Sequence, residues 1–232
     1  MTVVASSVHD NGKSLSFPRN LFVTGTDTNV GKTIVSSILV AGLKAFYWKP
    51  VQSGIADGTD SGDIQRLTGC LATSILPERY VLNEPLSPHA SAAIDGVRIS
   101  LADITLPSVD GPLIVEGAGG IMVPLNEKEL VLDMIAKFAL PTVIVARSGL
   151  GTINHTLLTI EALRRSGVDI FGVVMNGEAN ESNRLAIEHY GCVKVLAQIT
   201  PLGDLSPSKI AQSFSLFAPA VNLDGLKELS HV

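Results

Sequence analysis

One segment of the chain combines glycine, lysine and threonine at a spacing suited to holding phosphate. Residues 25–33 read GTDTNVGKT, with the apolar run LFVT before them and IV after them. In a phosphate-binding loop, backbone N–H groups at a helix start surround the phosphates, Lys32 would neutralise them and the Thr33 hydroxyl would ligate Mg²⁺. Five residues separate Gly25 from Gly31, one more than in the usual motif. We therefore predict a variant phosphate loop whose nucleotide contacts come from Asn29, Val30, Gly31, Lys32, Thr33 and Ile34.

The segment VEGAGG at residues 115–120 offers a second contact for a metal ion. Glu116 ends an apolar run, which is where enzymes with phosphate loops place an acidic metal ligand. A glutamate in a solvated turn is the alternative. The glycines that follow favour function, because they let the backbone N–H groups of Gly117, Ala118 and Gly119 approach an anion closely.

The segment KPVQSG at residues 49–54 offers a second cation. Lys49 at a strand end is either a solvated edge lysine or the extra positive charge that a site crowded with anionic oxygens needs. Ser53, four residues later, is a candidate hydrogen-bond partner for a substrate.

The acidic segment DGTDSGD contains three candidate metal ligands, Asp57, Asp60 and Asp63. Such a cluster is usually a solvated turn. We favour Asp63 because it opens the helical pattern DIQRL and so lies away from the loop tip.

Two histidines lie in further motifs. His89 in SPHASA is a candidate general base, although a capping or core role is the commoner one. GLGTINH at residues 149–155 runs from glycines into a helix, and such a helix start binds carboxylates well. His155 at its end is expected to be structural.

These segments must be positioned by a regular alternation of elements. Buried strands are expected over residues 21–25, 45–51, 112–116, 141–146, 170–176 and 193–199, and helices over 31–44, 61–69, 129–138, 153–166, 181–190 and 207–216. This order predicts a single α/β domain over residues 19–232, with a mainly parallel sheet covered by helices on both faces. Ligands then gather at the carboxyl ends of the strands, where Lys49, Glu116, Asn176 and Pro201 fall. Residues 1–18 are expected to be a flexible extension.

Composition limits the class of partner. The 232 residues are 46% hydrophobic and carry a net charge of −5, with no basic run, which argues against a nucleic-acid or anionic membrane partner and favours a small molecule. No secretory signal precedes the first strand, and we expect Cys70 and Cys192 to be buried free thiols of a cytoplasmic protein.

The motifs together resemble one family. GTDTNVGKT, KPVQSG, DGTDSGD, SPHASA, VEGAGG, GLGTINH and the strand end MN cover residues 21 to about 203, and they look like those of the dethiobiotin synthetases. The five-residue gap in the phosphate loop is that family's form of the motif. The resemblance implies a homodimeric ligase with a P-loop NTPase-like fold that uses ATP and Mg²⁺. Its substrates would be 7,8-diaminononanoate and CO₂, which it would join into the cyclic urea of dethiobiotin.

The resemblance also implies roles for individual residues. Lys32 would hold the phosphates and Lys49 would bridge a carbamate and the γ-phosphate. Magnesium would be organised by Thr33, Asp63 and Glu116. Substrate would be cradled by Ser53 and the Gly117–Gly119 backbone. The remaining contacts would be Asn176, Gly177, Pro201 and Leu202 to the adenine, and Gly151, Thr152 and Asn154 to the distal carboxylate across the dimer interface.

The chain departs from the family pattern in three places. Asn29 stands where some members have glutamate, which leaves the charge beside the phosphates open. The connection LKAFYWKPV lacks the usual glycine turn and is several residues short, so the end of the first helix and the strand after it are expected to be rearranged. Residues 1–18 have no counterpart, and the sequence after about 204 matches weakly.

Three other classes of phosphate-loop protein are alternatives. Amidating synthetases of the cobyrinic acid type carry a large glutaminase domain, for which the chain has no room. Partitioning and septum-placement ATPases need a lysine where this chain has Asp27, and they end in a membrane-binding helix that KELSHV is too short to form. Metal-chaperone GTPases read guanine with Asn-Lys-x-Asp, and no lysine follows Asn176.

Overall fold

The computed structural model describes residues 16–220 of the chain. Its strands are β1 (Asn20–Gly25), β2 (Phe46–Trp48), β3 (Val51–Ser53), β4 (Ile75–Leu76), β5 (Tyr80–Leu82), β6 (Leu113–Gly120), β7 (Thr142–Arg147), β8 (Ile170–Asn176) and β9 (Val195–Ile199). Its helices are α1 (Lys32–Leu43), α2 (Asp60–Thr68), α3 (Pro88–Ile94), α4 (Val131–Phe138), α5 (Thr152–Arg165), α6 (Glu181–Gly191) and α7 (Pro207–Ser213). Short 3₁₀ helices are η1 (Ala72–Ser74), η2 (Leu101–Asp103) and η3 (Phe214–Ala220).

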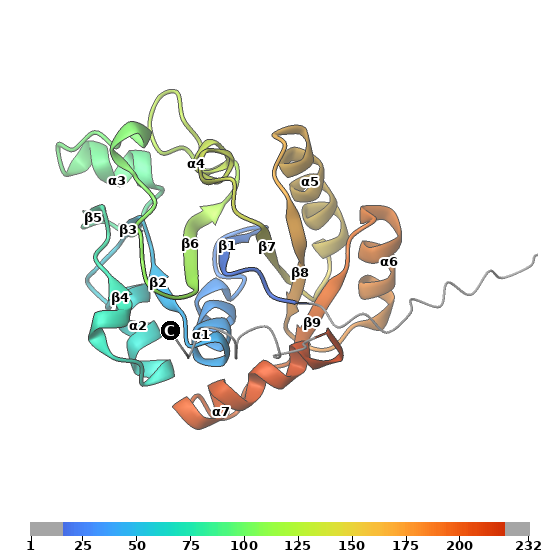
Figure 1. The fold of residues 1–232 in the computed structure, drawn as a ribbon. Helices are drawn as coiled ribbons and strands as arrows, with labels where there is room; N and C mark the ends of the chain where they lie inside the picture. Colours follow the sequence, from blue (N-terminus) through green and yellow to red (C-terminus); the bar gives the residue numbers. More distant parts are fainter. Residues whose placement is uncertain (1–15, 221–232) are drawn as a thin grey trace, which may run out of the picture.

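Seven of these strands form one sheet in the order β4-β2-β6-β1-β7-β8-β9, and all of its strand pairs are parallel (Figure 1). The strands β3 and β5 pair separately as a small parallel ribbon. The chain passes from β1 outward to β2 and later returns through β6 to β7 on the other side of β1. Strand order therefore reverses around β1, and a sheet of this kind binds ligands at the carboxyl ends of the strands at that point.

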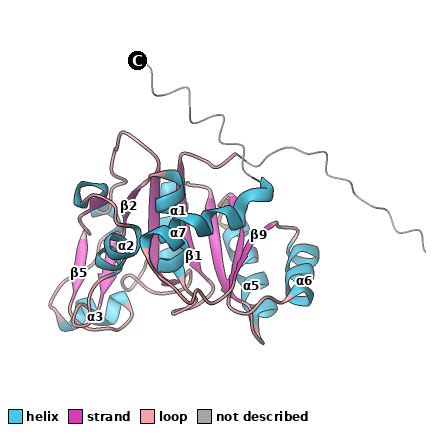
Figure 2. Ribbon diagram, turned by 90° about the horizontal axis from the view of Figure 1, so that it is seen from below, coloured by secondary structure: helices cyan, strands magenta, loops and turns pink. Residues whose placement is uncertain are grey.

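Helices cover both faces of the sheet, as the sequence predicts (Figure 2). Residues of α1, α2 and α7 pack in one apolar cluster on one face, and residues of α4, α5 and α6 pack in a second cluster on the other. Because both faces are covered, the central strands are buried over most of their length, and their sequences are nearly continuous apolar runs.

The phosphate loop leads directly into α1, and α1 ends in a way that replaces the missing glycine turn. Lys44 adopts the left-handed conformation at φ 51° and donates its backbone N–H to the Val40 carbonyl. That conformation is normally taken by glycine, because a side chain is strained there. Ala45 alone then separates Lys44 from β2, so α1 ends and β2 begins within one residue of the predicted positions, and the rearrangement expected for the helix end is limited to this left-handed turn.

The strand expected over residues 45–51 is wrong in one respect, because it is divided into β2 and β3. Pro50 lies between the two and has no N–H to donate, so the chain leaves the main sheet there. Its carbonyl instead accepts from the backbone N–H groups of Arg79 and Tyr80, which starts the pairing of β3 with β5. The strands β4 and β5 and the helix α3 were not predicted from the sequence.

The N-terminal extension expected over residues 1–18 falls largely outside the described residues. Phe17, however, already packs against the aromatic rings of Phe171, Phe214 and Phe217, so the folded part of the chain begins before residue 19.

The expected burial of the two cysteines is also wrong. Both thiols are free, with Cys70 half-buried and Cys192 exposed. None of the helices within residues 16–220 is long and apolar enough to cross a membrane.

Candidate active site

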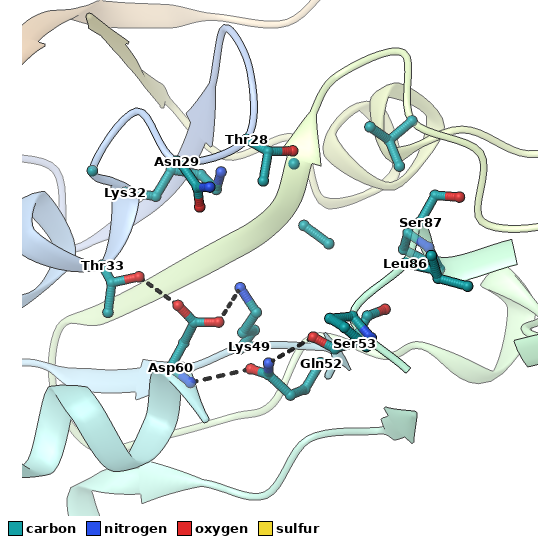
Figure 3. Close-up of a pocket in the computed structure, with 16 residues that line it drawn as sticks. Thr28, Asn29, Lys32, Thr33, Lys49, Gln52, Ser53, Asp60, Leu86 and Ser87 are labelled. Atoms are coloured by element: carbon teal, nitrogen blue, oxygen red, sulfur yellow. Dashed lines mark hydrogen bonds and ion pairs between the residues drawn. The ribbon is translucent and has the colours of Figure 1, made fainter. Parts of the chain in front are cut away.

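A cavity of about 670 Å³ lies at the carboxyl ends of the central strands, beside the phosphate loop. Figure 3 shows side chains from the loop, the end of β2, β3 and the start of α2 around it. The residues that line it are Thr28, Asn29, Gly31, Lys32, Thr33, Lys49, Gln52, Ser53, Asp60, Pro85, Leu86, Ser87, Pro88, Ala118, Gly119 and Val123.

The phosphate loop has the backbone shape that its glycine requires. Gly31 has φ 95°, and a Cβ at this position would overlap the side-chain amide of Asn176. That amide donates from Nδ2 to the Val30 carbonyl over 3.0 Å, which ties the end of β8 to the loop. The loop therefore needs glycine at residue 31 both for its backbone conformation and for space.

Lys32 extends back along the loop, and its Nζ donates to the Asp27 carbonyl over 3.3 Å. Burial lowers the pKa of Lys32, and the negative charge of Glu116 opposes that effect only in part. A buried ammonium without a carboxylate in contact is suited to receive anionic oxygens from a ligand.

Lys49 lies beneath the cavity between two carboxylates. Its Nζ is 3.0 Å from Asp60 Oδ2 and 3.3 Å from Glu116 Oε1, and it also donates to the Gly117 carbonyl over 3.4 Å. Burial alone would lower the pKa of Lys49, but Glu116 and then Asp60 outweigh burial and raise it above its usual value. Lys49 is therefore a fully charged, buried cation, and the surface-lysine alternative is excluded.

Glu116 is held from two sides. Ser36 on α1 donates to Oε2 over 2.6 Å, whereas Oε1 faces Lys49 and the Thr33 hydroxyl, the latter over 3.3 Å. The side chain has no exposed surface. The hydrogen bond from Ser36 thereby fixes the orientation of the Glu116 carboxylate, with Oε1 toward the phosphate loop. Ser36 was not predicted from the sequence.

The acidic partner of Thr33 is Asp60, which corrects the choice of Asp63. The Thr33 hydroxyl donates to Asp60 Oδ1 over 2.5 Å. Burial would raise the pKa of Asp60, but Lys49 and the hydrogen bond from Thr33 lower it below its usual value. Asp63 instead points to solvent, where it pairs with Arg66 over 2.7 Å.

The reason for this difference is where α2 begins. Thr59 is its N-cap and accepts from the Gly62 backbone N–H over 3.1 Å, so Asp60 is the first helical residue and Asp63 lies nearly one turn further along. A threonine before an acidic residue is a common helix start, and this was the signal in the sequence that favoured Asp60.

The cavity contains side chains suited to binding a magnesium ion together with phosphate. Thr33, Asp60 and Glu116 supply one hydroxyl and two carboxylates, the hard oxygen ligands that suit Mg²⁺ bound together with phosphate oxygens. Within the described residues, no three His, Cys, Asp or Glu side chains lie together as ligands for a metal ion. The set of Thr33, Asp60 and Glu116 fits a metal ion that binds together with the phosphates of a nucleotide.

Ser53 lines the other end of the cavity, and its buried hydroxyl has no protein partner. A buried hydroxyl without a partner is costly, which makes Ser53 a ready contact for a ligand. Ala118 and Gly119 also line the cavity, whereas Gly117 is buried beneath it. Val30 and Ile34 pack into the core behind the loop.

Several predicted site residues do not line this cavity. Asn176 ends β8 beside the loop, Gly177 follows it, and Pro201 and Leu202 follow β9. Gly151, Thr152 and Asn154 form the start of α5, where Thr152 is buried and the other two are exposed. The two histidines lie outside it as well: His89 is exposed and contacts Ser87 at 3.1 Å, and His155 is on the surface of α5.

Asp27 occupies the position where partitioning ATPases have a lysine, and it forms an ion pair with Arg147 at the end of β7 over 2.5 Å. A lysine there would instead meet the positive charge of Arg147. This pair therefore supports the sequence argument against that class.

Comparison with solved structures shows the fold. The chain is similar to the septum site-determining protein MinD of Pyrococcus horikoshii complexed with Mg-ADP, with a TM-score of 0.57, 16% identity, and coverage of 90% of this chain and 98% of that one. The cell division ATPase MinD of Pyrococcus furiosus gives a TM-score of 0.56 at 14% identity, covering 92% of this chain and 100% of that one. At such low identity these matches establish a P-loop NTPase fold and nothing further.

Comparison by sequence shows the family. A family model described as an AAA domain matches residues 19–209. The ATP-dependent dethiobiotin synthetase of Paramagnetospirillum magneticum is 54% identical over 193 residues, which cover 83% of this chain and 93% of that protein. The enzyme of the same name from Brucella melitensis biotype 2 is 49% identical over 195 residues, covering 84% and 92%. The chain belongs to the ATP-dependent dethiobiotin synthetases, enzymes of the ligase class in biotin biosynthesis.

Proposed function

We propose that this protein joins 7,8-diaminononanoate and CO₂ into dethiobiotin, with ATP converted to ADP and phosphate in the presence of Mg²⁺. The observation that carries the proposal is the contact of Lys49 with both Asp60 and Glu116 beside the phosphate loop. A reaction that crowds a carbamate, a triphosphate and a metal ion together needs this combination of cation and acidic groups.

The reaction would proceed in three steps. One substrate amine attacks CO₂, loses a proton and becomes a carbamate. A carbamate oxygen then takes the γ-phosphoryl group of ATP, which gives a carbamic-phosphoric anhydride and ADP. The second amine attacks the carbonyl carbon of that anhydride, so that phosphate leaves, a proton is lost and the cyclic urea closes.

Named side chains would serve these steps. Lys32 and the loop N–H groups would hold the phosphates, and Lys49 would bridge the carbamate and the γ-phosphate. Thr33, Asp60 and Glu116 would hold Mg²⁺, which neutralises phosphate charge when bound. The unpaired Ser53 hydroxyl would contact the substrate near its amines, together with the backbone at Gly119.

The adenine would lie beyond the phosphate loop. Asn176 is anchored to the Val30 carbonyl through Nδ2, which leaves Oδ1 to accept from the adenine amino group. Gly177, Pro201 and Leu202 follow the ends of β8 and β9, and they would form the walls of the base pocket.

The test is a product assay. Protein incubated with diaminononanoate, bicarbonate, Mg²⁺ and ATP should form dethiobiotin and phosphate in equal amounts, measured by mass spectrometry and a phosphate assay. Chelation of the divalent metal should abolish both products. ATP turnover that is indifferent to the diamine would refute the assignment.

We also propose that each site is completed by a second copy of the chain. The nine-carbon substrate carries its amines at one end and its carboxylate at the other. The N–H groups at the start of α5, at Gly151, Thr152 and Asn154, are suited to a carboxylate, but these residues do not line their own chain's cavity. In a symmetric dimer, each chain would lend this helix start to its partner.

Mixing two inactive variants tests the shared site. Lys32→Ala damages the cavity, and Asn154→Asp places a negative charge beside the proposed carboxylate site. A heterodimer has one site with both defects and one intact site, so an equal mixture should regain roughly a quarter of wild-type activity. Lys32→Ala mixed with Lys49→Ala is the control, because both defects lie in the same chain's cavity and no intact site forms. Proven subunit exchange without recovery in the first mixture would contradict the shared site.

A further inference from the structure

We propose that Gln52 is a positioning residue that fixes the separation between Ser53 and Asp60, and hence between the substrate amines and the phosphate-binding end of the cavity. The inference rests on the proposed function of these two residues. Gln52 is not itself placed among the reacting groups. Its side chain lines the cavity and is only 4% exposed.

Every polar group of the Gln52 amide is used. Its Nε2 donates to the Ser53 carbonyl over 3.1 Å, and its Oε1 accepts from the Asp60 backbone N–H over 3.2 Å (Figure 3). Nε2 also donates to the Gly54 carbonyl over 3.1 Å. The reversed amide would place an oxygen against two carbonyls and an N–H against an N–H. The three partners therefore fix one orientation of the side chain.

The segment that Gln52 spans needs such a connection. Residues 55–58 between β3 and α2 are exposed, and the Gly58 N–H to Ile55 carbonyl bond lies within the loop itself. Gln52 instead joins the two ends of the loop directly. It also pairs the first backbone N–H of α2, one of the donors that a helix start leaves without an internal partner.

The position of Asp60 matters because its carboxylate contacts two groups at once. It lies 3.0 Å from Lys49 and accepts from Thr33, and both contacts depend on where α2 begins. Release of the Asp60 N–H would let the helix start move relative to Ser53. Misplacement of a reacting group by about 1 Å costs roughly 10²-fold in rate.

The test compares three substitutions. Gln52→Met keeps the length of the side chain and removes all three hydrogen bonds. Thr68→Val removes the hydrogen bonds of Thr68 to the Ile64 carbonyl and the Cys70 backbone N–H at the far end of the same helix, and it controls for loss of helix stability. Gln65→Met makes the same change of side chain on the exposed face of α2. Thermal unfolding of all three variants shows whether the first two are matched in stability.

The expected result is a loss of kcat in Gln52→Met of roughly 10- to 10²-fold with little change in the KM for ATP. Thr68→Val and Gln65→Met should stay near wild type. In the protein without ligands, amide hydrogen exchange at residues 54–60 should accelerate in Gln52→Met.

Equal kcat values for Gln52→Met and Thr68→Val would overturn the inference, as would unchanged exchange at Asp60. The exchange measurement needs no turnover. Wild-type protein that forms no dethiobiotin would therefore refute the proposed function, while the exchange data would still decide whether Gln52 holds Asp60.

Discussion

Replacement of Lys49 by alanine is expected to lower kcat for dethiobiotin formation by at least about 10²-fold, the scale seen when one electrostatic stabiliser of a transition state is removed. Lys49 is the buried cation between Asp60 and Glu116, where carbamate and γ-phosphate would meet. Lys32→Ala should cause a comparable loss of kcat and also weaken nucleotide binding, because Lys32 lies in the phosphate loop itself. Steady-state kinetics and calorimetric titration with Mg·ADP measure the two effects separately.

Stability must be measured beside activity for the Lys49 variant. Removal of one member of a buried ion pair leaves its partner uncompensated and typically costs about 3–5 kcal/mol of the free energy of unfolding. Lys209→Ala on the exposed face of α7 is the control for removal of a lysine. If the Lys49→Ala protein folds and its turnover is undiminished, the role of Lys49 is limited to neutralising the charges of Asp60 and Glu116.

The second large effect is expected from Asp60. Asp60→Asn removes the negative charge that faces Thr33 and Lys49, and kcat should fall by about 10²-fold, with a higher Mg²⁺ concentration needed for half-maximal rate. Asp63→Asn is the matched control three residues away. Its exposed pair with Arg66 contributes little, so this variant should stay near wild type.

A double variant tests whether Asp60 serves one metal site with Glu116. Ligands of one site act as a unit, so Asp60→Asn with Glu116→Gln should cost much less than the product of the two single losses. Simple additivity across a Mg²⁺ titration would count against a shared site. A fall in kcat in Asp63→Asn as large as that in Asp60→Asn would show that Asp63 takes part in the metal site.

The sequence predicted those site residues that lie next to a strand end. Lys49 and Glu116 each follow an apolar run, Lys32 begins the helix that follows β1, and in a parallel sheet the carboxyl ends of the strands share one edge. Their convergence at one cavity is therefore a consequence of fold class. Resemblance to a family added roles to these residues, and comparison with curated relatives confirmed the family.

The sequence failed where a role depends on an exact helix start. Asp60 and Asp63 lie in one acidic segment, and composition alone does not distinguish them; only the threonine before Asp60 indicates that a helix begins there. The Thr59 cap makes Asp60 the first residue of α2, and this decides which carboxylate reaches Thr33. Helix boundaries are the least predictable part of an element, since a shift of a few residues changes the free energy of the isolated chain very little.

By itself, the sequence determined the α/β order, the phosphate loop and the positions of Lys49 and Glu116 at the ends of apolar runs, because each of these is a feature of consecutive residues. Only the tertiary structure decided that β2 and β3 separate at Pro50, that Ser36 holds Glu116 and that Gln52 joins Ser53 to Asp60. The bond from Ser36 to Glu116 connects residues 80 positions apart. Such contacts form only when helices pack on the sheet and exclude water, so that buried polar groups pair with one another across long distances in the sequence, and no local pattern predicts them.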